Sequence, residues 1–157
     1  MSGGSPLLHI VFVAPEIPPN TGTTARLCAA TETRFHLVGP LGFSLEDRYL
    51  RRAGLDYWPH VDVCPHESFA DYERAHPEAS MHLFTSRGGR SHTDVRFQPG
   101  DHLIFGGETS GLADAILERF PERRVTIPMS GKGVRSLNLA NAAAIGLYEA
   151  LRQLGRT

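Results

Sequence analysis

Three short segments of the chain combine glycine, proline and asparagine with charged side chains. They span residues 15–26, 103–112 and 127–142. Each begins within or just after an apolar run of the kind that forms a buried strand. Because open α/β sheets bind ligands in the loops that follow their strands, these segments are the candidates for one binding site.

The first segment is a proline-rich turn that leads into a helix. It delivers Asn20 and Gly22 to the start of that helix and Arg26 to a position further along it. A helix N-terminus close to an arginine attracts anions such as phosphate. The alternative is a capped helix start with a surface arginine.

The second segment places three glycines around an acidic residue: Gly106 and Gly107 precede Glu108, and Gly111 follows it. Glycine permits positive φ angles and lets a backbone approach a ligand closely. The segment is neither a dinucleotide fingerprint nor a phosphate loop, because both of those glycine patterns are absent. An ordinary tight turn remains the alternative.

The third segment is a glycine-, lysine- and arginine-bearing loop at 131–135 that leads to Ser136, Asn138 and Asn141. These polar residues suit either the capping of a helix or hydrogen bonds to adenine and ribose edges. The small residues of 142–146 that follow predict the close approach of another backbone, from a second subunit or from a crossing segment of the same chain.

Strands and helices are expected to alternate along the chain. Strands are predicted at 7–13, 35–38, 61–63, 81–85, 101–105 and 124–128, and helices at 20–30, 44–53, 68–76, 112–120 and 139–154. Pro15, Pro18 and Pro19 are expected to break regular structure before the first helix, with Asn20 or Thr21 as its N-cap. The alternation predicts an α/β fold with a mostly parallel sheet and helices on both faces. We expect a disordered tail at 1–6 and a single domain at 7–157.

The composition fits an ordinary folded protein. The 157 residues carry 16 basic and 17 acidic side chains, a balance that counts against nonspecific nucleic-acid binding and leaves room for one local basic face. Cys28 and Cys64 are expected to be reduced thiols, without a disulfide or a zinc site. No signal peptide or membrane-spanning run is recognised, so we expect a cytoplasmic protein.

Taken in order, the three segments resemble the motifs of the SPOUT methyltransferase superfamily. The resemblance covers about residues 8–155, and it is carried by Asn20, Gly22 and Arg26 in the first segment, by Gly106, Glu108, Gly111 and Leu112 in the second, and by Ile127, Pro128, Met129, Ser136, Asn138, Leu139 and Asn141 in the third. Residues 15–22, 50–57 and 148–150 further resemble the subfamily that methylates the wobble-nucleotide ribose of tRNA.

The resemblance implies a SPOUT fold with a C-terminal trefoil knot and a homodimer whose active sites lie at the interface. It implies S-adenosyl-L-methionine as cofactor, tRNA as partner and methyl transfer to the 2′-hydroxyl of cytidine or uridine at the wobble position. The alternatives are a 2′-O-methyltransferase for another tRNA or rRNA site, a noncatalytic RNA-binding module of the same fold, and a nucleotide-binding regulator.

The resemblance also nominates site residues. The catalytic candidates are Arg26, Asn20 and Glu108, and Glu108 is expected to pair with Arg26 or Asn20. The cofactor-binding candidates are Phe84, Thr85, Gly106, Gly111, Ile127, Met129, Ser136, Leu137 and Asn138. The RNA-binding candidates are Arg48, Arg51, Arg52, Lys132, Arg135 and Tyr148, of which Tyr148 fits core packing equally well. Methyl transfer from a sulfonium needs no metal, and we expect none.

Overall fold

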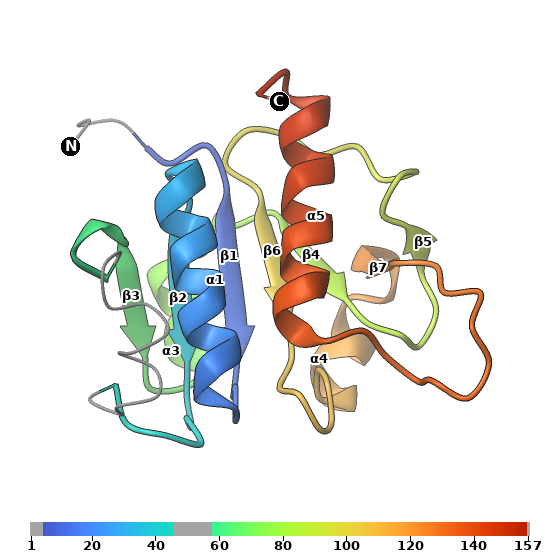
Figure 1. The fold of residues 1–157 in the computed structure, drawn as a ribbon, viewed down its shortest axis with the longest axis horizontal. Helices are drawn as coiled ribbons and strands as arrows, with labels where there is room; N and C mark the ends of the chain where they lie inside the picture. Colours follow the sequence, from blue (N-terminus) through green and yellow to red (C-terminus); the bar gives the residue numbers. More distant parts are fainter. Residues whose placement is uncertain (1–4, 46–57, 157) are drawn as a thin grey trace.

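Seven strands form one parallel sheet in the computed structural model, which describes residues 5–45 and 58–156 (Figure 1). Their order across the sheet is β3-β2-β1-β6-β4-β7-β5, and every adjacent pair runs parallel. The strands are β1 His9–Val13, β2 Arg34–Val38, β3 Val63–His66, β4 Met81–Phe84, β5 Arg90–Ser91, β6 His102–Phe105 and β7 Arg124–Thr126. The predicted parallel α/β sheet is therefore confirmed.

Helices cover both faces of this sheet. The helices are α1 Pro18–Thr31, α3 Phe69–Ala75, α4 Asp114–Arg119 and α5 Leu139–Gln153, with the 3₁₀ turns η1 Trp58–His60 and η2 Pro121–Arg123. Helices α1 and α5 pack side by side on one face, and α3 and α4 lie on the other (Figure 1). No helix of the described segments is long and apolar enough to span a bilayer.

The strands have apolar side chains on both sides because each face is covered. Successive residues of a strand point to opposite faces. Phe12 and Phe105 therefore pack in the cluster beneath α1 and α5, while Val11 and Ile104 pack with Tyr72 in the cluster beneath α3 and α4. This double burial explains the uninterrupted apolar runs in the sequence.

Helix α1 begins earlier than the sequence predicts. Its first residue is Pro18, and its N-cap is Ile17, which makes no side-chain capping bond. Proline fits the first turn because its missing N–H would have no helical partner there, so the two prolines start the helix instead of preceding it. The prediction that Asn20 or Thr21 caps this helix was wrong, and the Asn20 side chain is free for another role.

The other boundaries differ from the predictions by a few residues. Ser68 caps α3 by accepting a hydrogen bond from the Asp71 N–H, as the predicted helix start requires. The strand expected at 61–63 begins at Val63 instead, and it contains Pro65, which the edge of a sheet tolerates. Strand β5 was missed because the adjacent glycines indicated a turn. Most of the helix predicted at 44–53 lies outside the described residues.

Gly146 of α5 makes room for an aromatic ring. A Cβ atom on Gly146 would lie 2.9 Å from the Phe84 ring, which the glycine therefore accommodates. At Gly146 a side chain from β4 fills the space, and the close approach of a second subunit along residues 142–146 stays a prediction. The trefoil knot stays a prediction.

Candidate active site

Glu108 joins the loop after β6 to the loop after β1. One of its carboxylate oxygens accepts the backbone N–H of Glu16 at 2.7 Å. The other accepts the N–H of Ile17 at 2.9 Å and the Asn20 side-chain amide at 3.2 Å. Three donors on one carboxylate fix the rotamer of Glu108 and hold the start of α1 against the second loop. Of the two pairings expected for Glu108, the structure has the one with Asn20.

Asn20 extends this network to the third segment. Its side-chain oxygen accepts a hydrogen bond from the Asn138 amide at 3.1 Å. Asn138 is in turn the N-cap of α5, where its side-chain oxygen accepts the Asn141 N–H at 3.0 Å. The capping role predicted for this position is confirmed, and the same side chain also bridges two loops that are 118 residues apart.

The second loop folds back on itself at its glycines. The Gly111 N–H donates to the Gly107 carbonyl at 2.9 Å, and Gly111 has a φ of 68°. A Cβ atom on Gly106 would lie 2.0 Å from the Gly111 carbonyl carbon, so no other residue fits at Gly106 without moving the loop. The glycines are therefore required by backbone contact within the loop, and this contact shapes the wall of the neighbouring cavity.

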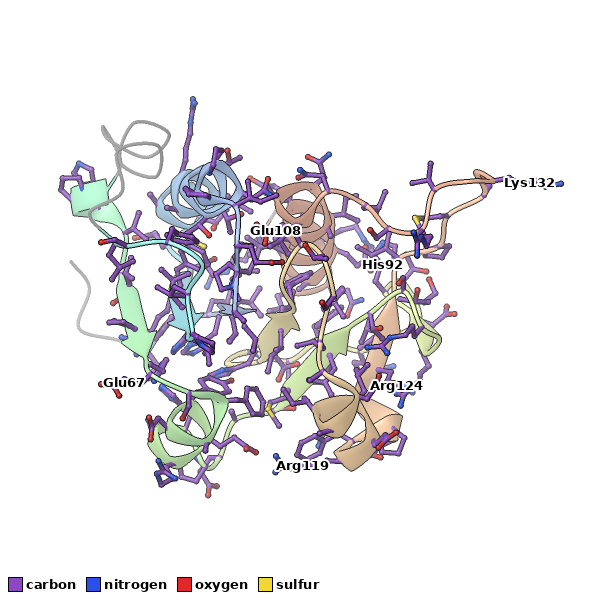
Figure 2. All side chains as sticks on the ribbon, turned by 90° about the horizontal axis from the view of Figure 1, so that it is seen from below. Glu67, His92, Glu108, Arg119, Arg124 and Lys132 are labelled. Carbon is purple, nitrogen blue, oxygen red and sulfur yellow. The ribbon has the colours of Figure 1, made fainter. Side chains whose placement is uncertain are left out.

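The three loops enclose a cavity of about 860 Å³, a size that suits a ligand of a few tens of heavy atoms. All nine predicted cofactor-binding residues line it, together with Asn20, Glu108 and Arg135; the nine are Phe84, Thr85, Gly106, Gly111, Ile127, Met129, Ser136, Leu137 and Asn138. Glu108 lies near the ends of α1 and α5 (Figure 2). Residues from four separate stretches of chain thus converge at the carboxyl ends of β4, β6 and β7.

Other predicted residues lie elsewhere. Arg26 is exposed on α1 and does not line the cavity of its own chain. Lys132 is at the tip of the loop before α5 and projects away from the body of the chain (Figure 2). Tyr148 is 47% exposed on α5, and this exposure excludes core packing within one chain. Arg48, Arg51 and Arg52 lie outside the described residues, so their RNA contacts stay predictions.

Two further cavity residues were not among the predicted cofactor-binding residues. Arg87 lines the cavity, donates to the Leu112 carbonyl at 2.6 Å and forms an ion pair with Asp114. Phe105 stacks on Phe84 with ring centroids 4.5 Å apart. Arg87 directly precedes two glycines in the loop after β4, a signal that could have placed it in a ligand-binding loop; the Phe105 position indicated only core.

The site can bind a ligand that has both apolar and hydrogen-bonding surfaces. Phe84 and Phe105 form an apolar wall, and Met129 and Leu137 are each 37% exposed at its rim. Glycine-rich and post-strand loops supply peptide groups beside that wall. Such a cavity accepts a flat heteroaromatic group with polar edges. The fold and site define an α/β protein that binds its ligand in loops at the carboxyl edge of a parallel sheet.

The chain belongs to the SpoU rRNA Methylase family, whose model matches residues 7–148. A tRNA (cytidine(34)-2′-O)-methyltransferase from Burkholderia pseudomallei (strain 1106a) is 49% identical over 153 residues, which cover 95% of this chain and 97% of the relative. The enzyme of the same name from Escherichia coli (strain K12) is 45% identical over 150 residues, 95% of each chain.

Solved structures agree with this membership. One solved structure is described as giving insight into 2-OH methylation of C/U34 on tRNA. It has a TM-score of 0.91 and is 48% identical, and the match covers 98% of this chain and 100% of that chain. A SpoU methyltransferase from Streptomyces viridochromogenes in complex with the cofactor AdoMet has a TM-score of 0.84 and 25% identity over 99% of this chain and 64% of that one. The fold predicted from the sequence is thus shared with methyltransferases of this family.

Proposed function

We propose that this protein transfers a methyl group from S-adenosyl-L-methionine to the ribose 2′-hydroxyl of the wobble nucleotide, cytidine or uridine 34, of tRNA. The observation that carries the proposal is the convergence of three loops on one cavity, joined by the bonds from Glu108 to Asn20 and from Asn138 to Asn20. The full-length similarity to two enzymes with this activity supports the choice of substrate. We assign the activity to one domain, residues 7–157, in the cytoplasm.

The residues around the cavity fit the proposed cofactor. Its adenine would contact the apolar wall and the loop backbone, with Ser136 and Asn138 near its polar edges. Glu108 and Asn20 hold the loops that form the cavity and so position the cofactor indirectly. When bound, S-adenosyl-L-methionine supplies a methyl group on a sulfonium centre, which is transferred by in-line displacement. A family member with AdoMet bound supports this assignment.

We assign Arg26 to the 2′-hydroxyl. A guanidinium keeps its proton at neutral pH, so it does not act as a literal general base. It orients the hydroxyl and stabilises the negative charge that develops on the oxygen, while a phosphate of the RNA accepts the proton. This role requires the guanidinium to lie beside a cavity, which its own chain does not provide.

A homodimer satisfies that requirement. One exposed stripe of α5 carries Asn141, Ile145, Tyr148 and Arg152, and Arg26 is exposed on the neighbouring helix α1. Ile145 is 39% and Tyr148 is 47% exposed, which is unusual for large apolar side chains on one helix face. We infer that a second copy covers this face and that Arg26 of one protomer serves the cavity of its partner.

The wobble nucleotide would enter beside the loop that carries Lys132 and Arg135. Both are exposed, and Arg135 also lines the cavity, so a phosphate bound there would lie close to the cofactor. Arg48, Arg51 and Arg52 are assigned to the same RNA surface on the resemblance alone. Removal of these charges is expected to weaken tRNA binding and reduce its salt dependence.

Methyl transfer to total tRNA with a tritiated donor, followed by mapping of the labelled nucleotide, tests the proposal. The expected product carries label on the ribose of nucleotide 34, and ribosomal RNA is not labelled. Label at another tRNA position or in rRNA would show that the substrate is not nucleotide 34 of tRNA. If a folded dimer binds the cofactor but transfers no methyl group, the proposed methylation is wrong and a noncatalytic RNA-binding role takes its place.

A further inference from the structure

Five histidines gather on the face of the sheet that α3 covers. They are His9 on β1, His36 on β2, His66 on β3, His102 on β6 and His76 directly after α3. His9, His36 and His102 are 7%, 0% and 3% exposed, although imidazole is polar. Buried polar groups in such number need partners. None of the five lines the cavity described above.

His36 is the central member of this histidine cluster. One of its ring nitrogens, Nε2, shares a hydrogen bond with His9 Nδ1 at 2.8 Å, and the other, Nδ1, shares one with His66 Nε2 at 3.0 Å. Each of these hydrogen bonds joins two imidazoles, so one ring of each pair accepts with a nitrogen lone pair. A neutral imidazole carries a nitrogen lone pair, which is what a metal ligand requires.

Two sets of three histidines bring their nitrogens within 4.8 Å of one another, but only one set has members that reach solvent. In the set of His9, His36 and His102, the rings of His9 and His102 are stacked at 3.9 Å and 12°. All three side chains of this set are buried, and His102 Nδ1 is already hydrogen-bonded to the Tyr72 hydroxyl at 2.5 Å, so the set offers an ion no open path from solvent.

The second set consists of His36, His66 and His76. The His36 and His66 rings are nearly parallel, at 18°, and the His76 ring lies in a different plane, at 88° to His36 and 78° to His66. Tetrahedral zinc with Zn–N bonds of about 2.0–2.1 Å holds neighbouring nitrogens about 3.4 Å apart. The 3.0 Å between His36 and His66 needs only a small increase to admit an ion.

The surroundings of this set also match a metal site. If His36 Nδ1 binds an ion, its Nε2–H donates to His9, which is the outer hydrogen bond that orients metal-bound histidines. His66 and His76 are half-buried, so an ion can enter from solvent on their side. Three imidazoles suit zinc, nickel or copper and leave a fourth position for water.

We propose that His36, His66 and His76 bind one divalent transition-metal ion, zinc in the first instance, at a site separate from methyl transfer. The ligands come from β2, β3 and the end of α3, so the ion would join that helix to two strands at the side of the sheet. The sequence analysis expected no metal, because methyl transfer from a sulfonium needs none. The proposed ion would lie at a separate site and take no part in that reaction.

The test uses the full chain without a polyhistidine tag, stripped with a chelator and titrated with Zn²⁺ in a calorimeter. We expect one ion per chain and, at Zn²⁺ a hundredfold above Kd, a rise in Tm of about 5–10 °C that Mg²⁺ does not reproduce. Co²⁺ in place of Zn²⁺ should give the visible absorption of a tetrahedral nitrogen site.

The variants His66→Ala and His76→Ala should each weaken Zn²⁺ binding at least tenfold and remove the Co²⁺ spectrum. His92→Ala is the matched control, because it removes another half-buried histidine outside the cluster. Failure of the native chain to bind Zn²⁺ overturns the proposal and leaves a metal-free imidazole network. Binding that survives in both cluster variants overturns it as well, whether or not those variants are less stable.

Discussion

Two polar clusters of this protein lie in different parts of the same sheet, and their polar groups find hydrogen-bond partners in different ways. At the carboxyl edge, the charged Glu108 accepts hydrogen bonds from three N–H groups of a distant loop. On the α3 face, neutral histidines hydrogen-bond to one another between adjacent strands. The edge cluster is open to a ligand, whereas the core of the histidine cluster is closed to solvent.

This difference predicts how each cluster should respond to mutation or to a change in pH. A network of loops at an edge positions groups for a ligand, so its disruption should reduce activity and cofactor affinity. A network beneath a helix contributes to the folded state, so its disruption should reduce stability and leave cofactor binding intact. Four predictions test this division, beginning with the largest effect.

Arg26→Ala should give the largest effect on activity. Loss of a group that stabilises developing charge typically reduces turnover about 10²–10³-fold. Arg26 is exposed and outside the cavity, so cofactor affinity measured by calorimetry should stay within about twofold of the native value. Lost cofactor binding would contradict the assignment.

Mixing this variant with a cavity-blocked variant, Leu137→Asp, tests whether Arg26 acts across the dimer. Each mixed dimer would then contain one intact composite site, and random exchange of subunits should restore about a quarter of native activity. If Arg26 serves its own chain, the mixture stays inactive.

Glu108→Gln should reduce both stability and cofactor affinity. The amide NH₂ would face an N–H donor of the first loop in place of a carboxylate oxygen, at a cost of about 1–3 kcal/mol. The Tm should fall by about 2–10 °C. Glu118→Gln removes an exposed carboxylate on α4 and is the charge-matched control, with a change below about 0.5 kcal/mol. Equal effects of the two variants would remove the special role of Glu108.

Acid should destabilise the folded chain through the histidine cluster. Burial lowers the pKa of His9 to about 4 and that of His102 to about 3, so these rings stay neutral in the folded chain below pH 6.5. Unfolding returns them to a pKa near 6.5 and takes up protons, so stability is lost as the pH falls from about 6.5 to 4. The loss should be about 1.4 kcal/mol per pH unit for each such histidine.

Urea unfolding of the metal-free chain at a series of pH values measures this slope. The other titratable and charged groups of the region are Arg34, Asp62, Asp71, Tyr72, Glu73, His36, His66 and His76. His60→Ala, which removes an exposed histidine of η1, should leave the slope unchanged. A stability that is flat between pH 6.5 and 5 would mean that the cluster already binds protons in the folded state.

The smallest effects come from two helix caps of the same kind. Asn138→Ala and Ser68→Ala each remove a side-chain oxygen that caps a helix, α5 and α3 respectively, and each should cost about 1 kcal/mol. Only Asn138→Ala should also weaken cofactor binding, because this residue lines the cavity and holds Asn20. Equal cofactor affinity in the two variants would contradict the division between edge and face.

Much of the edge site could be predicted from sequence because its residues lie in short motifs. Gly111 has a positive φ and Asn138 caps α5, and local backbone geometry restricts which residues fit at both positions. Arg87 and Phe105 were not predicted to line the cavity, because an ion-paired arginine and a buried strand residue look the same in sequence wherever they occur. The prolines of α1 were misplaced because proline both breaks a helix and begins one.

The sequence by itself determined the alternation of strands and helices, the two-sided burial of the sheet and the loops that bear chemistry. These follow from periodicity and from residues with restricted backbones, which act over a few positions. Only the tertiary structure decided that histidines at 9, 36, 66, 76 and 102 meet, because strand order brings β3, β2, β1 and β6 side by side. It likewise decided that Asn20 contacts Asn138, since a contact across 118 residues depends on how the chain closes its loops and no local signal records that closure.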